Sequence, residues 1–166
     1  MTTEITDTLF QEAERLVALA RARGATVTFA ESCTGGLAAA ALTSVAGSSE
    51  VFRCGFVTYA DAAKTGLLGV SPATLRRFGA VSEETARAMA LGARSCATAD
   101  MAAGITGVAG PDGGSEEKPV GLVCFGFAFD GGVFSRRCQF AGTRAAIRAE
   151  AATFALAVLR ERMEEA

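Results

Sequence analysis

Helical and extended segments alternate along the first two thirds of this chain, and this alternation constrains the fold more than any other feature. Residues 2–23 carry apolar side chains at helical spacing before Gly24, and residues 26–30 form a β-branched run that predicts a strand. Strands are also predicted over 51–59 and 100–106, and helices over 37–45, 60–68, 82–96, 143–164 and in a short segment beginning at Ser71 and Pro72. This order predicts an α/β domain.

The last two predicted strands, over 120–129 and 133–140, flank the turn Asp130-Gly131-Gly132, which is a strong β-hairpin signal. A hairpin makes its two strands antiparallel, whereas strands joined through helices pair in parallel. The sheet is therefore predicted to be mixed. The 166 residues contain no internal linker, repeat or low-complexity tract, so a single domain over residues 1–166 is expected.

The sequence contains no histidine, which excludes Ser-His-Asp and Cys-His sites, two-histidine metal sites and any imidazole acid or base. A net charge of −2 argues mildly against nucleic-acid binding. The cysteines are widely spaced with no CxxC pair, and neither they nor the acids show metal-ligand spacing, so no metal is expected. Reduced thiols, no signal peptide and no apolar run of about 20 residues predict a cytoplasmic protein without a membrane segment.

The first candidate site is the predicted strand-to-helix turn that contains Ser32, Cys33, Thr34, Gly35 and Gly36. The glycines let backbone N–H groups face a ligand, and a helix N-terminus there would favour a phosphate or a developing oxyanion. A serine or threonine that only caps the helix is the alternative interpretation. Ser32 is favoured over Cys33 as a nucleophile, because a cysteine works best beside a histidine.

The second candidate site joins Tyr59, the single tyrosine, to Lys64, one of only two lysines in the chain. A buried lysine can take the proton of a serine, whereas an arginine stays charged. The alternative is a surface lysine on a short helix. The other lysine, Lys118, lies in an acidic, proline-flanked segment and is expected to be solvated.

Two further segments could face a ligand. Thr106 and Gly107 open a glycine-rich loop after a predicted strand, an arrangement common at ligand sites, although the loop matches neither the P-loop nor the GxGxxG pattern. Arg144 begins the last predicted helix, with Arg148 one turn further on, and an arginine there can bind a phosphate. A flexible surface loop and solvated arginines are the alternatives.

Together these segments resemble the C-terminal domain family of the competence/damage-inducible protein CinA. The resemblance covers about residues 8–160 and rests on AESCTGGLAAAALTSVAGSS, the Tyr59 and Lys64 segment with LLGVSP, GAVSEETARAMA, GITGVAGPDGG with EKPVG, and FAGTRAAIR. Two departures are small: the family often has asparagine or serine after the tyrosine, and usually aspartate where Thr143 stands.

The resemblance implies a three-layer α/β/α domain that deamidates nicotinamide mononucleotide to nicotinate mononucleotide and ammonia, in pyridine-nucleotide salvage and NAD metabolism. In that mechanism Ser32 attacks the amide carbon, and Lys64, directly or through Tyr59, takes the serine proton. Backbone N–H groups from Cys33 to Gly36 stabilise the oxyanion, and the loop of Thr106 and Gly107 together with Arg144 holds the mononucleotide. No cofactor is implied.

Two other functions stay open at this point. One is a serine amidohydrolase with another substrate, since pocket shape decides the substrate. The other is a non-catalytic module that binds a partner in competence or DNA damage. The joint presence of Ser32, Tyr59 and Lys64 argues against pure binding, because no binding role requires that trio. The sequence leaves the oligomeric state open, a homo-oligomer included.

Overall fold

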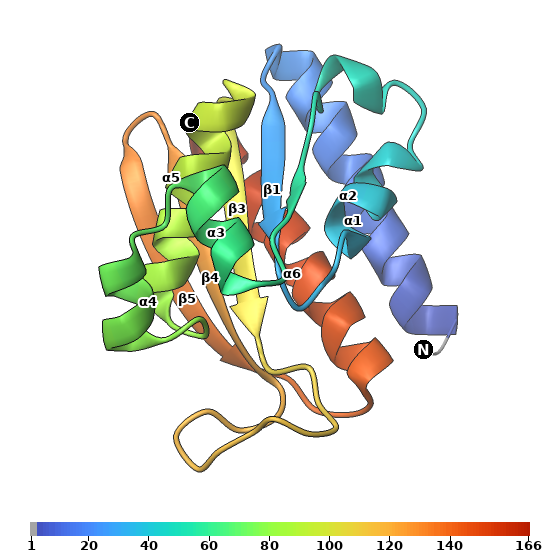
Figure 1. Ribbon diagram of the computed structural model, residues 1–166. Helices are drawn as coiled ribbons and strands as arrows, with labels where there is room; N and C mark the ends of the chain where they lie inside the picture. Colours follow the sequence, from blue (N-terminus) through green and yellow to red (C-terminus); the bar gives the residue numbers. More distant parts are fainter. Residues whose placement is uncertain (1–2) are drawn as a thin grey trace.

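A single sheet with helices on both faces forms the protein (Figure 1). The computed structural model describes residues 3–166, with side chains from residue 6 onwards, so the predicted helix start at Thr2 lies outside the described residues. The strands are β1 (Val27–Glu31), β2 (Phe56–Val57), β3 (Met101–Gly107), β4 (Leu122–Phe129) and β5 (Gly132–Gln139). The helices are α1 (Thr3–Arg23), α2 (Leu37–Thr43), the 3-10 turn η1 (Ser48–Glu50), α3 (Asp61–Leu68), α4 (Pro72–Phe78), α5 (Glu83–Ala97) and α6 (Arg144–Glu165).

The five strands lie in the order β2-β1-β3-β4-β5. β1 pairs in parallel with β2 and β3, whereas β4 pairs antiparallel with both β3 and β5. The α/β class, the mixed sheet and the late hairpin are therefore confirmed. The sheet has a parallel and an antiparallel part because helices connect the parallel strands, whereas a tight turn connects β4 to β5.

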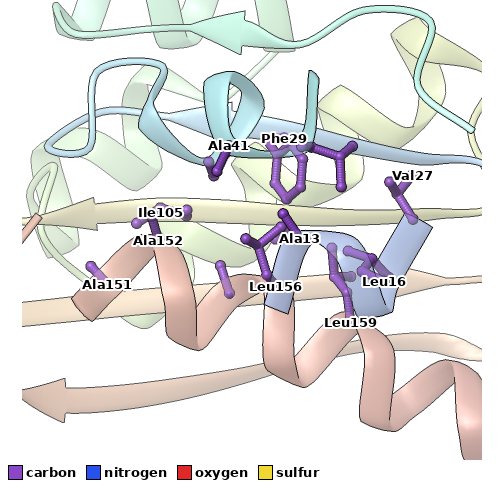
Figure 2. Packing of buried hydrophobic residues seen from close by; sticks show 14 of the residues in the cluster. Ala13, Leu16, Val27, Phe29, Ala41, Ile105, Ala151, Ala152, Leu156 and Leu159 are labelled. Atoms are coloured by element: carbon purple, nitrogen blue, oxygen red, sulfur yellow. The ribbon is translucent and has the colours of Figure 1, made fainter. Parts of the chain in front are cut away.

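Two hydrophobic layers enclose the sheet, as the resemblance implied. On one face, α1, α2 and α6 cover alternate strand residues such as Phe29 and Ile105, which are fully buried (Figure 2). On the other face, α3 and α5 cover the residues that point the opposite way, such as Ala30 and Ala102. The alternation arises because successive side chains of a strand point to opposite faces.

Helix α5 lies directly on the backbone of the two central strands. Gly104 of β3 and Gly126 of β4 are paired in register. A Cβ atom at Gly104 would lie 2.4 Å from the carbonyl oxygen of Ala86, and one at Gly126 would lie 2.2 Å from the same oxygen. Glycine is therefore required at both positions for this close approach, which brings the start of α5 to the sheet edge where β3 ends.

The predicted strand over 51–59 is wrong in extent, because only Phe56 and Val57 pair with β1. Val51 ends the 3-10 turn η1, and its side chain is buried in the core. Phe52 packs its ring against Phe29, with 5.9 Å between the ring centroids. The apolar residues that suggested a strand are thus buried by a turn and a loop instead.

The predicted helix starts at Ser71, Ser82 and Thr143 are confirmed. Each side-chain oxygen accepts a backbone N–H of the following helix. Such caps satisfy donors that have no partner within the helix itself, so they fix the start of α4, α5 and α6. Two of these starts, those of α5 and α6, lie next to the site described below.

Asp100 ties the start of β3 to the start of β1 and provides a first test of the fold. Its carboxylate accepts from the N–H and the hydroxyl of Thr26, at 2.7 and 2.8 Å. The N–H of Thr26 is the main cause that lowers the pKa of Asp100. A carboxylate whose pKa is lowered by folding stabilises the protein above its ordinary pKa, near 3.8, and loses that effect as the pH falls through the lower folded value.

We expect Asp100→Asn to lower the free energy of unfolding at neutral pH by about 1 kcal/mol. The value is kept this small because Asp100 is exposed and solvent screens its charge. The difference from wild type should disappear in acid, below the folded pKa of Asp100. Urea unfolding at the two pH values measures both effects. Asp130→Asn is the matched control, because Asp130 is fully exposed. An Asp100→Asn deficit that stays constant with pH would contradict the assignment.

Candidate active site

The predicted site residues meet at one edge of the sheet. Ser32 follows β1, Tyr59 follows β2 and Thr106 lies near the end of β3. Since these three strands are parallel, their carboxyl ends share an edge, where α/β folds commonly bind ligands. A cavity of about 220 Å³ opens there. Its lining includes seven of the predicted residues, namely Ser32, Cys33, Tyr59, Lys64, Thr106, Gly107 and Arg144.

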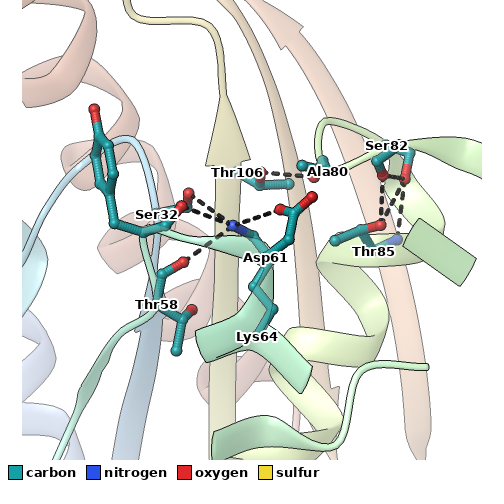
Figure 3. Close-up of polar contacts among 10 residues, drawn as sticks. Ser32, Thr58, Asp61, Lys64, Ala80, Ser82, Thr85 and Thr106 are labelled. Carbon is teal, nitrogen blue, oxygen red and sulfur yellow. Dashed lines mark hydrogen bonds and ion pairs between the residues drawn. The ribbon is translucent and has the colours of Figure 1, made fainter. Parts of the chain in front are cut away.

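Lys64 is a buried amine that lies against Ser32 (Figure 3). Only 1% of the lysine is exposed. Its Nζ atom lies 3.0 Å from the carbonyl oxygen of Thr58, 3.2 Å from that of Tyr59 and 3.3 Å from Oγ of Ser32. A surface lysine is therefore excluded. The carboxylate of Asp61, on the first turn of α3, lies 3.5 Å from the same nitrogen.

The two carbonyl groups direct the chemistry of this amine. A carbonyl oxygen can only accept a hydrogen bond, so Thr58 and Tyr59 each take one N–H of Lys64. A neutral amine has two N–H groups and one lone pair. In the ammonium form the third N–H donates to Oγ of Ser32. In the neutral amine both N–H groups are taken by the carbonyl oxygens, so the lone pair faces the Ser32 hydroxyl and can accept its proton. The arrangement thus suits transfer of the Ser32 proton to Lys64.

Glu31 holds the turn that carries Ser32. Its buried carboxylate accepts N–H groups of Gly36, Ala38 and Ala39, at 3.0, 3.1 and 2.9 Å. A carboxylate at a helix N-terminus is favoured by the helix dipole and satisfies donors that lack partners within α2. Glu31 was not singled out from the sequence. The signal that could have identified it is its position: an acidic residue directly before a turn that ends in two glycines and leads into a helix.

The N–H groups of the turn divide into two sets. Gly35 donates to the carbonyl oxygen of Ser32 at 3.1 Å, and Gly36 donates to Glu31. The N–H groups of Cys33 and Thr34 donate to no other residue in the described part of the chain. The four donors expected from the sequence therefore narrow to two that bind no other described residue. Cys33 lines the cavity, whereas Thr34 is fully buried, and Thr34, Gly35 and Gly36 are not among the lining residues.

Cys33 is poorly suited to be the nucleophile. Its side chain is buried, and this burial raises the pKa of the thiol to about 12. A thiol reacts through its thiolate, which is scarce at neutral pH when the pKa is so high. Ser32, 9% exposed and in contact with Lys64, remains the better candidate.

Arg144 and Tyr59 meet at the mouth of the cavity. One guanidinium nitrogen of Arg144 donates to the Tyr59 hydroxyl at 3.1 Å, and another donates to the carbonyl oxygen of Gly110 at 2.6 Å. Arg144 thereby joins the glycine-rich loop to the end of β2. Lys64 contacts the main-chain oxygen of Tyr59, so the phenol does not bridge Lys64 and Ser32.

Thr106 holds the connection between α4 and α5, and Lys118 holds the last residue of α4. The Thr106 hydroxyl donates to the carbonyl oxygen of Ala80 at 2.8 Å (Figure 3), so its lone pairs are left for other donors. The Lys118 amine donates to the carbonyl oxygen of Phe78 at 2.8 Å. The expectation of a solvated Lys118 is therefore wrong, because this contact leaves the lysine half-buried.

Three other observations bound the site. No group of three or more potential metal ligands occurs among the described residues. No helix in that part of the chain is both long and apolar enough to span a membrane. Two larger cavities of about 400 Å³ lie at the opposite sheet edge and beside α6, and neither has a lysine or a serine in its lining. A third, of about 260 Å³, is lined by Ser82 and Lys118, but Ser82 caps α5 and the Lys118 amine donates to the carbonyl oxygen of Phe78.

Comparison with known proteins gives consistent matches over nearly the whole chain. Residues 10–163 match the family model described as the CinA C-terminal domain. The chain is 57% identical over 143 residues to a protein of Enterobacter agglomerans named nicotinamide-nucleotide amidohydrolase PncC, covering 85% of this chain and 87% of that protein. It is 52% identical over 152 residues to the protein of the same name from Escherichia coli K12, covering 91% and 92%. The crystal structure of the competence/damage inducible protein CihA from Agrobacterium tumefaciens superposes with a TM-score of 0.91 at 43% identity, covering 95% and 96%.

The state of the cysteines can be tested by alkylation with iodoacetamide. Cys54 and Cys96 are exposed and should react in the folded protein. Burial raises the pKa of Cys33 to about 12 and that of Cys124 to about 11, so these thiols should react only after denaturation. Peptide mass mapping separates the sites. Rapid alkylation of Cys33 in the folded protein would contradict its burial and make it a candidate nucleophile again.

Proposed function

The chain belongs to the CinA C-terminal domain family, and we propose that it is a nicotinamide-nucleotide amidohydrolase, which hydrolyses nicotinamide mononucleotide to nicotinate mononucleotide and ammonia. The observation that carries the proposal is the 3.3 Å contact between Nζ of Lys64 and Oγ of Ser32 at the base of a polar cavity. The proposed substrate is taken from the names of the similar proteins. The contact and these names together support amide hydrolysis through an activated serine.

The first step forms an ester on Ser32. Oγ attacks the carbon of the nicotinamide carboxamide while its proton passes to the lone pair of Lys64. The carboxylate of Asp61, 3.5 Å away, stabilises the ammonium that results. Because this carboxylate is exposed, solvent screens much of its effect.

The charge that develops on the carboxamide oxygen needs hydrogen-bond donors. The N–H groups of Cys33 and Thr34 are the two in the turn without an acceptor among the described residues, and they directly follow the nucleophile. An N–H of the residue after the nucleophile has the same role in other serine hydrolases. These two groups would therefore form the oxyanion hole.

The tetrahedral intermediate collapses when the carbon–nitrogen bond breaks. The Lys64 ammonium returns its proton to the leaving nitrogen, which departs as ammonia. A water molecule then attacks the ester carbon and gives a proton to Lys64. Cleavage of the ester returns that proton to Oγ and releases nicotinate mononucleotide, so atoms and protons balance over the cycle.

The rest of the substrate lies within reach of the cavity mouth. Arg144 still has guanidinium N–H groups besides the two bonded to Tyr59 and Gly110, and these could bind phosphate oxygens. The Thr106 hydroxyl can accept a hydrogen bond from a ribose hydroxyl. Tyr59 is 62% exposed at the mouth, and its ring could offer a face for the pyridine ring.

The nucleophile can be tested by substituting the adjacent residues Ser32 and Cys33. In Ser32→Ala, ammonia release from nicotinamide mononucleotide should fall by at least about a thousandfold, because only binding and oxyanion donors remain. Cys33→Ala should lose less than about tenfold, the effect of a small cavity. Assays with a chelator present also test the expected independence from metals. An active Ser32→Ala variant beside an inactive Cys33→Ala variant would reverse the assignment.

The role of Lys64 as base can be tested by a charge-preserving change. Lys64→Arg keeps the positive charge but cannot accept the serine proton, so turnover should fall by about a hundredfold or more. Lys118→Arg is the matched control and should stay near the wild-type rate, since among the described residues the Lys118 amine bonds only the Phe78 carbonyl. Circular dichroism should show that both variants are folded. A normal rate in Lys64→Arg would leave the lysine as an electrostatic anchor only.

A further inference from the structure

Arg148, on the second turn of α6, contacts the turn that carries the proposed nucleophile. Its Nε donates to the carbonyl oxygen of Cys33 at 3.1 Å, and its Nη2 donates to that of Thr34 at 2.8 Å. The side chain is half-buried, and among the described side chains it forms no ion pair. Its charge is therefore directed at these two carbonyl groups. A structural arginine on the same helix, Arg160, instead pairs with Glu12 and Glu164.

The geometry of the peptide bond makes this contact relevant to the other side of the turn. In a planar trans peptide, the carbonyl oxygen and the N–H point in opposite directions. The Cys33 carbonyl and the Thr34 N–H belong to one such peptide. Holding the carbonyl against Arg148 therefore turns the Thr34 N–H away from the arginine. This N–H donates to no other described residue, and it lies in a fully buried residue next to Cys33, which lines the cavity.

Gly35 lets the guanidinium come this close. A Cβ atom at that position would lie only 3.2 Å from Nη2 of Arg148, and its φ of +60° also favours glycine. On the far side of the turn, Glu31 holds the N–H of Gly36. The Glu31 carboxylate thus binds N–H groups of the turn, and the Arg148 guanidinium binds its carbonyl groups.

We propose that Arg148 is a positioning residue for the oxyanion hole of the proposed amidohydrolase reaction. Its guanidinium fixes the peptide between Cys33 and Thr34, and its charge polarises that peptide so that the Thr34 N–H is a stronger donor. The inference rests on the proposed function for its substrate, but the reactivity of Ser32 tests it separately. Arg148 itself touches no reacting atom.

The first experiment measures ammonia release by Arg148→Met, which keeps the aliphatic packing and removes the donors. We expect kcat to fall about 10- to 100-fold, less than for loss of an oxyanion donor, because the Thr34 N–H is still present. KM should change by less than about threefold, since the oxyanion exists only in the transition state. Arg148→Lys should lose less than Arg148→Met. Guanidinium ion should partly restore Arg148→Ala and leave wild type unchanged.

Arg160→Met is the matched control on the same helix. It removes contacts to Glu12 and Glu164 and should lower the free energy of unfolding without changing kcat. A fall in kcat equal to that of Arg148→Met would mean that α6 stability alone is being measured, and would overturn the proposal. A raised KM with unchanged kcat in Arg148→Met would also overturn it, because Arg148 would then bind substrate.

The second experiment does not depend on the substrate. A fluorophosphonate forms a bond from its phosphorus to Oγ of Ser32 with loss of fluoride, and its P=O oxygen requires the same N–H donors. Intact-mass kinetics should show labelling at least about tenfold slower in Arg148→Met than in wild type. This result would support the role of Arg148 even if nicotinamide mononucleotide were not hydrolysed, in which case only the proposed function fails. Equal labelling rates would overturn the role of Arg148.

Discussion

The burial of one lysine amine against two main-chain carbonyl groups is the interaction on which the site depends. Thr58 and Tyr59 turn their carbonyl oxygens toward Nζ of Lys64, and Ser32 completes its surroundings. A buried amine without such partners would be costly, so the end of β2 and the start of α3 must keep this shape. The same constraint places the lysine beside the hydroxyl. The contacts that stabilise the buried amine are therefore also the ones that place it beside Ser32.

The turn after β1 is held from two sides by opposite charges. Glu31 accepts three N–H groups at the start of α2, and Arg148 donates to two carbonyl groups in the middle of the turn. The N–H groups of Cys33 and Thr34 are left over. Preorganised donors of this kind stabilise developing charge without rearrangement during the reaction.

Helix α6 joins the separate parts of the site. Arg144 reaches the Tyr59 hydroxyl and the Gly110 carbonyl, and Arg148, one turn later, reaches the turn that carries Ser32. Residues four apart lie on one face of a helix, so a single element aligns three segments. From the sequence, phosphate binding was one interpretation of these two arginines. Local spacing could not indicate that Arg148 instead donates hydrogen bonds to main-chain oxygens 115 and 114 residues earlier in the chain.

The sequence by itself determined the order of helices and strands, the capped starts of α4, α5 and α6 and the late hairpin, because these follow from local periodicity and side-chain caps. From residue chemistry it also singled out Ser32 and Lys64 as candidate site residues. Tertiary structure alone decided that the apolar run from Val51 is mostly buried by a turn rather than paired in a strand. It also decided which oxygen of Tyr59 meets Lys64, and which N–H groups stay free. These outcomes depend on where distant main-chain atoms point once the layers have packed. No local pattern of side chains encodes that direction.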